Sequence, residues 1–148
     1  MSAKRLHVRV ISPDRVVFEG EAASLQFPGG DGLYGILPRH APLITTVEPG
    51  VLRLVDDRGE ETRLAIARGF VSVKDDRIEF AVDAGEPAAE IDVERARAAA
   101  ERARERMRGK VHTSEVEDMV TEYALLRALA RLRAAGKYHE HHGAHGSH

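Results

Sequence analysis

The chain has 148 residues, with 22 basic and 24 acidic side chains, a formal net charge of −2 and no cysteine. The near-neutral charge argues against a general nucleic-acid binder. The lack of cysteine excludes a disulfide framework, a thiolate zinc site and a cysteine nucleophile. No apolar run reaches the ~20 residues of a membrane-spanning helix, and the first residues lack the apolar core of a signal peptide. We therefore expect a soluble chain that is not secreted.

The composition divides the chain into three segments. All six prolines lie within residues 1–87, residues 92–137 are rich in Ala, Arg, Glu and Leu, and five of the eight histidines lie in the last ten residues. We therefore predict a β-sandwich domain over residues 1–87, a two-helix hairpin over residues 88–137 and a disordered, His-rich tail over residues 138–148.

Short β-strands are predicted through the first segment, because apolar and polar residues alternate there between turn signals. The predicted strands cover residues 6–10, 16–18, 24–27, 43–47, 51–55, 62–66, 70–73 and 78–82. Residues 56–59 and 74–77 have the composition of hairpin turns, and the glycine-rich residues 28–32 are predicted to form a loop. Many short strands with frequent turns favour an all-β sandwich or a flattened barrel.

No catalytic set is evident in this segment. The glycine-rich loop lacks the Lys-Ser/Thr of a phosphate loop, and Ser12, Ser24 and Ser72 lack the context of a nucleophile elbow. His40 lies between two prolines, where it could act as a base or could bond to the backbone of its own turn, and we favour the second role. Without a nucleophile, a base and an orienting group, an enzyme is not expected.

Two capped helices are predicted after residue 91. Asp92 is the expected N-cap of a first helix that runs to Arg108 and stops at Gly109. Ser114 opens a capping box for a second helix, which Gly136 ends. The connection is short, so the two helices should lie antiparallel.

Each predicted helix has an apolar face. The first face is narrow, with small side chains that let a partner approach closely, and the second is wider. The first comprises Val93, Ala96, Ala100, Ala103 and Met107, and the second comprises Val116, Val120, Tyr123, Leu125, Leu129 and Leu132.

Arginines recur on one side of each predicted helix. Arg95 and Arg102 are seven residues apart, and Arg127 and Arg131 are four apart. An antiparallel hairpin would bring Arg127 level with Arg95, and Arg131 level with Asp92, at the open end. Converging guanidiniums repel one another and would favour an anion such as phosphate between them. The alternative is a solvated face laced with weak ion pairs.

The tail carries His139, His141, His142, His145 and His148. We expect a disordered end, and a remnant of an expression tag is an alternative. Imidazoles at this density could also bind Ni²⁺, Cu²⁺ or Zn²⁺ weakly, and they could add positive charge below pH ~6.5.

Four stretches carry a resemblance to a known family. They are residues 6–17, GLYGILPRHAPL at 32–43, EPGVL at 48–52 and RGFV at 68–71. In these stretches, and over residues 5–137 as a whole, the chain resembles the ε subunit of the bacterial and chloroplast F-type ATP synthase. The resemblance implies a β-sandwich followed by a two-helix hairpin, which agrees with the pattern of residues.

The resemblance also implies a function without catalysis. The chain would be a central-stalk rotor subunit that couples rotation of the c-ring to ATP synthesis in the α/β hexamer, peripheral to the cytoplasmic face of a bacterial membrane and requiring no cofactor. The sandwich would dock on the γ subunit and the c-ring. The implied edge comprises Asp31, Gly32, Leu33, Tyr34, Ile36 and His40.

A regulatory role for the hairpin follows from the same resemblance. Folded against the sandwich, the hairpin would permit rotation, and extended into the hexamer it would block ATP hydrolysis. Some relatives bind ATP through an Ile/Leu-Asp-x-x-Arg-Ala motif and further arginines. The matching residues here are Glu86, Ile91, Asp92, Arg95, Ala96, Arg102, Arg127 and Arg131.

The resemblance implies different roles for the arginines and the carboxylates of this site. Arg95, Arg127 and Arg131 would hold the phosphates, while Asp92 and Glu86 would contact the adenine, the ribose or a neighbouring arginine. ATP would act as a regulatory ligand, and no set of Mg²⁺ ligands is evident. A second hypothesis is a stand-alone ligand-binding sandwich with a helical arm that senses a nucleotide or a metal.

Overall fold

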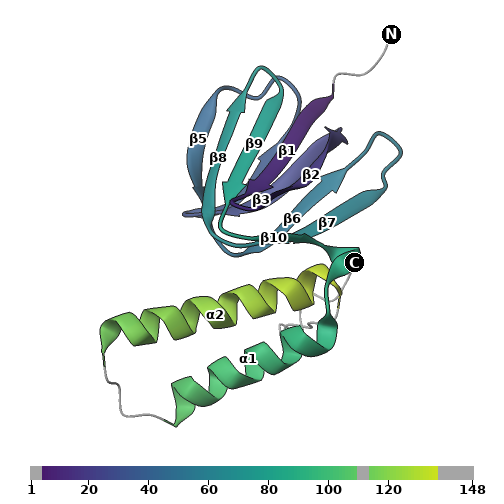
Figure 1. The fold of residues 1–148 in the computed structure, drawn as a ribbon. Coiled ribbons are helices and arrows are strands. Elements are labelled where there is room, and N and C mark those ends of the chain that lie inside the picture. The colour runs from purple at the N-terminus through teal and green to yellow at the C-terminus, as the bar shows by residue number, and fades with distance from the viewer. Residues whose placement is uncertain (1–4, 110–113, 137–148) are drawn as a thin grey trace, which may run out of the picture.

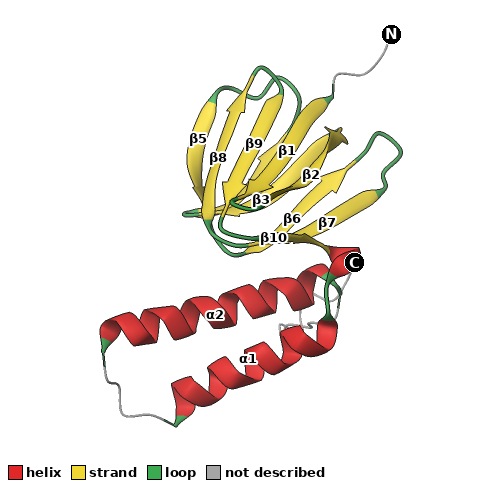
Figure 2. Cartoon of the chain, in the orientation of Figure 1, coloured by secondary structure: helices red, strands yellow, loops and turns green. Residues whose placement is uncertain are grey.

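The computed structural model describes residues 5–109 and 114–136. A β domain is followed by a short 3-10 turn and two long helices that lie beneath one end of the sheet (Figure 1). Strands and helices occupy separate parts of the chain, as Figure 2 shows by colour. The strands are β1 Leu6–Ser12, β2 Arg15–Ala22, β3 Ser24–Gly29, β4 Gly32–Ile36, β5 Leu43–Val47, β6 Gly50–Val55, β7 Glu61–Ile66, β8 Gly69–Lys74, β9 Arg77–Val82 and β10 Gly85–Pro87. The helices are η1 Ala88–Glu90, α1 Val93–Arg108 and α2 Glu115–Ala134.

The strands form one strongly curved sheet in the order β10-β7-β6-β3-β5-β8-β9-β1-β2, with β4 paired to β3. β1 and β9 pair in parallel, and the other pairs are antiparallel. The sheet curls over so that its inner face encloses the core, which gives a nearly closed sandwich. The predicted fold class is confirmed.

The core follows from the alternation of side chains along each strand. Leu6, Val8 and Val10 are buried, while the residues between them face the solvent. Phe27 and Phe80 lie at the centre with no exposed surface, and their rings meet edge to face with centroids 5.3 Å apart. Each of these rings carries a large share of the apolar area that holds the sandwich together.

Sequence reasoning missed the strand β4. Residues 32–36 form β4, which pairs with β3 so that Leu25 lies opposite Ile36. Gly32 has a φ of +136°, which suits the turn before β4. Because glycine adopts such angles readily, it is also typical of loops, and the sequence here looks like a loop. Gly35 further weakens the local strand pattern. The loop predicted over residues 28–32 is shorter in the structure, a turn at Gly30 and Asp31, because Pro28 and Gly29 belong to β3 and Gly32 to β4.

The helices begin and end where their caps predict. The Asp92 carboxylate accepts a hydrogen bond from the Arg95 N–H at 3.1 Å, and the Ser114 hydroxyl accepts one from the Glu117 N–H at 3.1 Å. Gly109 is the C-cap of α1. The helices run antiparallel, and α1 begins beside the end of α2 (Figure 1). No helix in the described part of the chain is both long and apolar enough to span a membrane.

The hairpin has a small apolar core of its own, separate from that of the sandwich. Its buried members are Ala96, Ala100, Ala128, Leu129 and Leu132. The apolar faces were predicted to reach further along both helices. This part was wrong, because Met107, Val116 and Val120 are exposed near the outer end of the hairpin.

Candidate functional site

α2 presents opposite faces to α1 and to the sandwich. Leu125, Ala128, Leu129 and Leu132 belong to the core shared with α1. At 100° per residue, Tyr123, Arg127, Ala130 and Ala134 lie on the other side of the helix. This second face packs against β6 and β7. Its combination of small and polar side chains is typical of a contact that can separate more easily than a hydrophobic core.

Tyr123 makes the first polar contact between the hairpin and the sandwich. Its hydroxyl accepts a hydrogen bond from the Arg68 backbone N–H at 3.3 Å and donates one to Asp83 Oδ2 at 3.1 Å. The Arg68 guanidinium lies over the Tyr123 ring, 3.7 Å from its centroid. The pKa of Tyr123 is raised above its ordinary value, chiefly because burial disfavours the phenolate.

Arg131 makes the second polar contact. Its Nε donates to Glu86 Oε1 at 2.9 Å, and the two side chains are only 28% and 27% exposed. Glu86 lies on β10 opposite Ala65 of β7, so the carboxylate belongs to the sheet edge beneath α2. This pair therefore links β10, the strand that precedes the hairpin, to the C-terminal part of α2.

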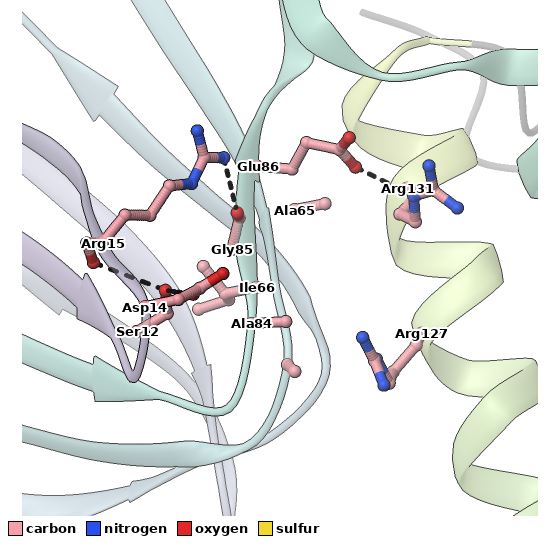
Figure 3. Close-up of a pocket in the computed structure, with 11 residues that line it drawn as sticks. Ser12, Asp14, Arg15, Ala65, Ile66, Ala84, Gly85, Glu86, Arg127 and Arg131 are labelled. Carbon is pink, nitrogen blue, oxygen red and sulfur yellow. Dashed lines mark hydrogen bonds and ion pairs between the residues drawn. The ribbon is translucent and has the colours of Figure 1, made fainter.

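A cavity of about 300 Å³ lies between these elements (Figure 3). Ala65, Ile66, Ala67, Ala84 and Gly85 supply small or apolar side chains and backbone to its lining. Its charged and polar lining is Ser12, Asp14, Arg15, Glu86, Arg127 and Arg131. A volume of this order lies at the lower end of the range for small-molecule pockets.

Three guanidiniums and two carboxylates line the cavity, which gives a net charge of +1. Arg15 is partly neutralised, because it donates to the Gly85 carbonyl at 3.2 Å and lies 3.5 Å from Glu90. Arg127 makes no ion pair with the described residues, and its guanidinium points toward the sandwich (Figure 3). The arrangement can therefore attract an anion, with Arg127 as the cation most available to it.

The structure brings together three of the predicted nucleotide-site residues, Glu86, Arg127 and Arg131, around one cavity. Ile91 is half-buried where η1 ends, and Ala96 is buried between the helices.

Asp92, Arg95 and Arg102 lie on the other helix of the hairpin or at its start, and none of them lines the cavity. Asp92 caps α1, and Arg95 and Arg102 are exposed. The eight-residue nucleotide site remains a prediction.

The predicted partner edge lies at the β3–β4 hairpin. Leu33 is 69% exposed, and Asp31 and Gly32 are also exposed. Tyr34 is half-buried against Phe27, and its hydroxyl donates to Asp31 at 2.8 Å.

Ile36 is 1% exposed and supports this edge from within the core. His40 lies in the segment after β4, and its Nδ1 donates to the Ala41 carbonyl at 2.7 Å. This bond confirms the predicted role of His40 in its own turn.

The five histidines of the tail, which was predicted to be disordered and for which weak metal binding was a possibility, lie outside the described residues. Within the described part of the chain, no group of three or more potential metal ligands occurs.

Sequence reasoning missed the two sandwich partners of Tyr123, which are Arg68 and Asp83. It placed Tyr123 on the apolar face of the second helix, yet Tyr123 is four residues before Arg127 and eight before Arg131. That spacing places all three on one side of a helix and was an available signal. The sandwich partners gave no such signal, because they come from the ends of different strands.

Two family models together match nearly the whole chain. The β-sandwich domain of the ATP synthase delta/epsilon chain matches residues 5–88, and its long α-helix domain matches residues 89–136. The chain belongs to the ATP synthase delta/epsilon chain family. Membership confirms the resemblance stated above, and with it the prediction of a non-catalytic ATP synthase subunit.

Bacterial relatives in this family align over almost their full length. The ATP synthase epsilon chain of Moorella thermoacetica is 44% identical over 131 residues, which cover 88% of this chain and 96% of the relative. That of Desulforamulus reducens is 42% identical over 133 residues, covering 90% and 98%. That of Synechococcus elongatus is 40% identical over 131 residues, covering 88% and 95%. These alignments include both the sandwich and the hairpin.

A chain of the Euglena gracilis mitochondrial ATP synthase has a similar fold, with a TM-score of 0.73 and 23% identity over 88% of this chain and 81% of that one. A chain of the Tetrahymena thermophila enzyme, from its central stalk and c-ring structure, matches with a TM-score of 0.58 and 12% identity, covering 91% and 99%. At these identities the likeness concerns the fold.

Proposed function

We propose that this chain is the epsilon-type rotor subunit in the central stalk of an F-type ATP synthase, where it couples c-ring rotation to ATP synthesis and restrains ATP hydrolysis through its hairpin. Family membership over both domains supports the rotor role. The same membership favours it over a stand-alone ligand-binding sandwich.

The observation that carries the regulatory part is the separate core of the hairpin. Apolar contacts within the hairpin join α1 to α2, whereas the contact between α2 and the sandwich includes Tyr123 and the Glu86–Arg131 pair. A hairpin built in this way can leave the sandwich as a unit without opening the sandwich core. Docked and detached positions are the two states that such a regulator requires.

The β3–β4 edge would be the docking surface for the γ subunit and the c-ring. The exposure of Asp31, Gly32 and Leu33 supports this role, because an exposed leucine beside a tight turn can fit a partner's pocket. The detached hairpin would reach the α/β hexamer. Contacts with these partners would hold the subunit peripherally at the cytoplasmic face of a bacterial membrane.

ATP is the proposed regulatory ligand of the docked state. The availability of Arg127, beside the paired Arg131 and Glu86, supports a phosphate site under α2. A ligand that contacts both the sandwich and the hairpin stabilises the docked form by mass action. Reaching Arg95 and Asp92 from this cavity would require the ligand to extend across the start of α1.

Deletion of residues 89–148 tests the regulatory role. In the reconstituted ATP synthase, the deletion should raise ATP hydrolysis several-fold, because the inhibitory segment is removed while the β3–β4 edge stays intact. Co-purification of the truncated chain with γ is the control for assembly. An unchanged hydrolysis rate in the assembled complex would mean that this hairpin does not inhibit.

Titration calorimetry of the full-length chain tests the nucleotide site. Wild type should bind ATP, and Arg127→Ala should weaken binding about tenfold or more, because a charge-assisted contact to phosphate is lost. Arg106→Ala is the matched control, since Arg106 is an exposed arginine in the last turn of α1. No heat from wild type at millimolar ATP would rule the site out.

A further inference from the structure

We propose that Tyr123, Arg68 and Asp83 form a latch that holds the hairpin on the sandwich in the absence of any nucleotide. The regulatory consequence of docking rests on the proposed function, but the latch itself is a property of the isolated chain. Its effect is to set how often the hairpin detaches when the cavity under α2 is empty.

The latch consists of one side chain from α2 and a socket on the sandwich. The Tyr123 hydroxyl bonds to Arg68 and Asp83 at once, at 3.3 Å and 3.1 Å, and the Arg68 guanidinium covers the ring. A cation over an aromatic face adds an attraction that a simple apolar contact lacks. All three interactions break together when α2 leaves the sandwich.

The socket is held by the sheet, independently of the hairpin. Arg68 follows β7 and Asp83 follows β9, and the Asp83 N–H donates to the Arg68 carbonyl at 2.9 Å. The Ala67 N–H donates to the Ala84 carbonyl at 2.9 Å, which adds one more residue of each segment to this pairing. Tyr123 therefore docks into a preformed site, so little ordering is required when it binds.

The latch adjoins the proposed nucleotide site without lining its cavity, since the Arg127 guanidinium lies 5.6 Å from the centroid of the Tyr123 ring. Tyr123, Arg68 and Asp83 do not line the cavity beneath Arg127 and Arg131. Tyr123 precedes Arg131 by eight residues, which is about 12 Å along a helix. Two attachments at this spacing prevent α2 from pivoting about either one. Occupancy of the cavity would thus add to docking that the latch already provides.

Labelling of a single introduced cysteine measures detachment directly, because the natural chain has none. Ala130→Cys places a thiol on the sandwich-facing side of α2, where Ala130 is 1% exposed. With a thiol reagent and no nucleotide, the labelling rate of the full-length chain is proportional to the detached fraction. Adding Tyr123→Phe should raise this rate about tenfold, as expected for losing hydrogen bonds that include one to a carboxylate.

Tyr34→Phe is the matched control. It also removes a tyrosine hydroxyl that donates to an aspartate, but in the β3–β4 hairpin. Tyr34→Phe should leave Cys labelling at position 130 unchanged. Asp83→Ala should raise it several-fold. The Tyr123→Phe/Asp83→Ala double variant should raise the rate over wild type by less than the product of the two separate effects, because both substitutions remove the same hydrogen bond.

A second thiol separates release of the hairpin from loss of the fold. Ala22→Cys reports on opening of the sandwich, where Ala22 is buried on β2. An unchanged rate at position 130 in Tyr123→Phe would overturn the latch, and so would an equal rise at positions 22 and 130. The assay contains neither ATP nor the other subunits, so a failure of the proposed nucleotide site or of inhibition would not alter its outcome.

Discussion

At the scale of the residue, the environment of a charge decides what it contributes. The Glu86–Arg131 pair is about three-quarters buried and bridges two domains, at 2.9 Å. The Glu94–Arg97 pair is similar in length, at 3.0 Å, but both side chains are largely exposed on α1. Solvent screens the second pair and leaves it worth little. Only the first pair holds the hairpin against the sandwich.

Glu86→Gln should destabilise the docked hairpin by about 1–2 kcal/mol, because Arg131 then keeps a neutral partner in a partly buried site. Glu94→Gln, the matched control, should cost no more than about 0.5 kcal/mol. Both values can be measured from urea unfolding followed by helical circular dichroism, since the described helices lie almost entirely in the hairpin. Equal effects of the two substitutions would contradict the importance of the interdomain pair.

At the scale of the element, α2 combines two contacts of different strength. Its inner face shares an apolar core with α1, and its outer face meets the sandwich through Tyr123 and small or charged side chains. The Tyr123 contact depends on a protonated phenol, because the hydroxyl donates to the Asp83 carboxylate. Arg68 and Arg127 also face the ring, from the sandwich and from α2 itself.

Docking should therefore weaken at alkaline pH. Burial raises the pKa of Tyr123 above the ordinary value of 10.0, so the neutral phenol is favoured in the docked state. The resulting stability is fully present below pH 10 and is lost as pH rises through the raised pKa. Cys labelling at position 130, corrected for the intrinsic thiol reactivity at each pH, should rise through this range in wild type. In the Tyr123→Phe variant this rise of the labelling rate with pH should be absent. Identical pH profiles in wild type and Tyr123→Phe would contradict the prediction.

At the scale of the whole molecule, two cores give two units of different stability. The sandwich core is large and includes Phe27, Phe80 and residues from strands far apart in sequence. The hairpin core is small and dominated by alanine and leucine. A helix pair with so little buried apolar area gains much of its stability from the surface on which it rests.

A chain truncated after residue 88 should remain folded, because the hairpin contributes nothing to the core of the sandwich. It should keep its β-type circular dichroism and unfold cooperatively, with a midpoint lowered by only a few degrees. Far-ultraviolet circular dichroism and a thermal scan would measure both. Loss of cooperative unfolding would show that the sandwich needs the hairpin.

The sequence alone determined the features that depend on neighbours along the chain. Alternation at Leu6, Val8 and Val10 predicted a strand because side chains in a strand point to opposite faces. The caps at Asp92 and Ser114 predicted both helix starts because a cap bonds to a backbone N–H only three residues away. The fold class follows from many such local signals, and the family motif at residues 32–43 added the function.

The tertiary structure decided which surfaces meet. The sequence places Tyr123 on a helix, but its partners Arg68 and Asp83 are 55 and 40 residues away. They come together only where the segments that follow β7 and β9 are hydrogen-bonded to each other. The same packing placed Arg127 and Arg131 at a cavity beside the sandwich that neither Arg95 nor Asp92 lines. Local spacing states which residues share a helix face, while the energy of burying that face against a particular sheet decides what it contacts.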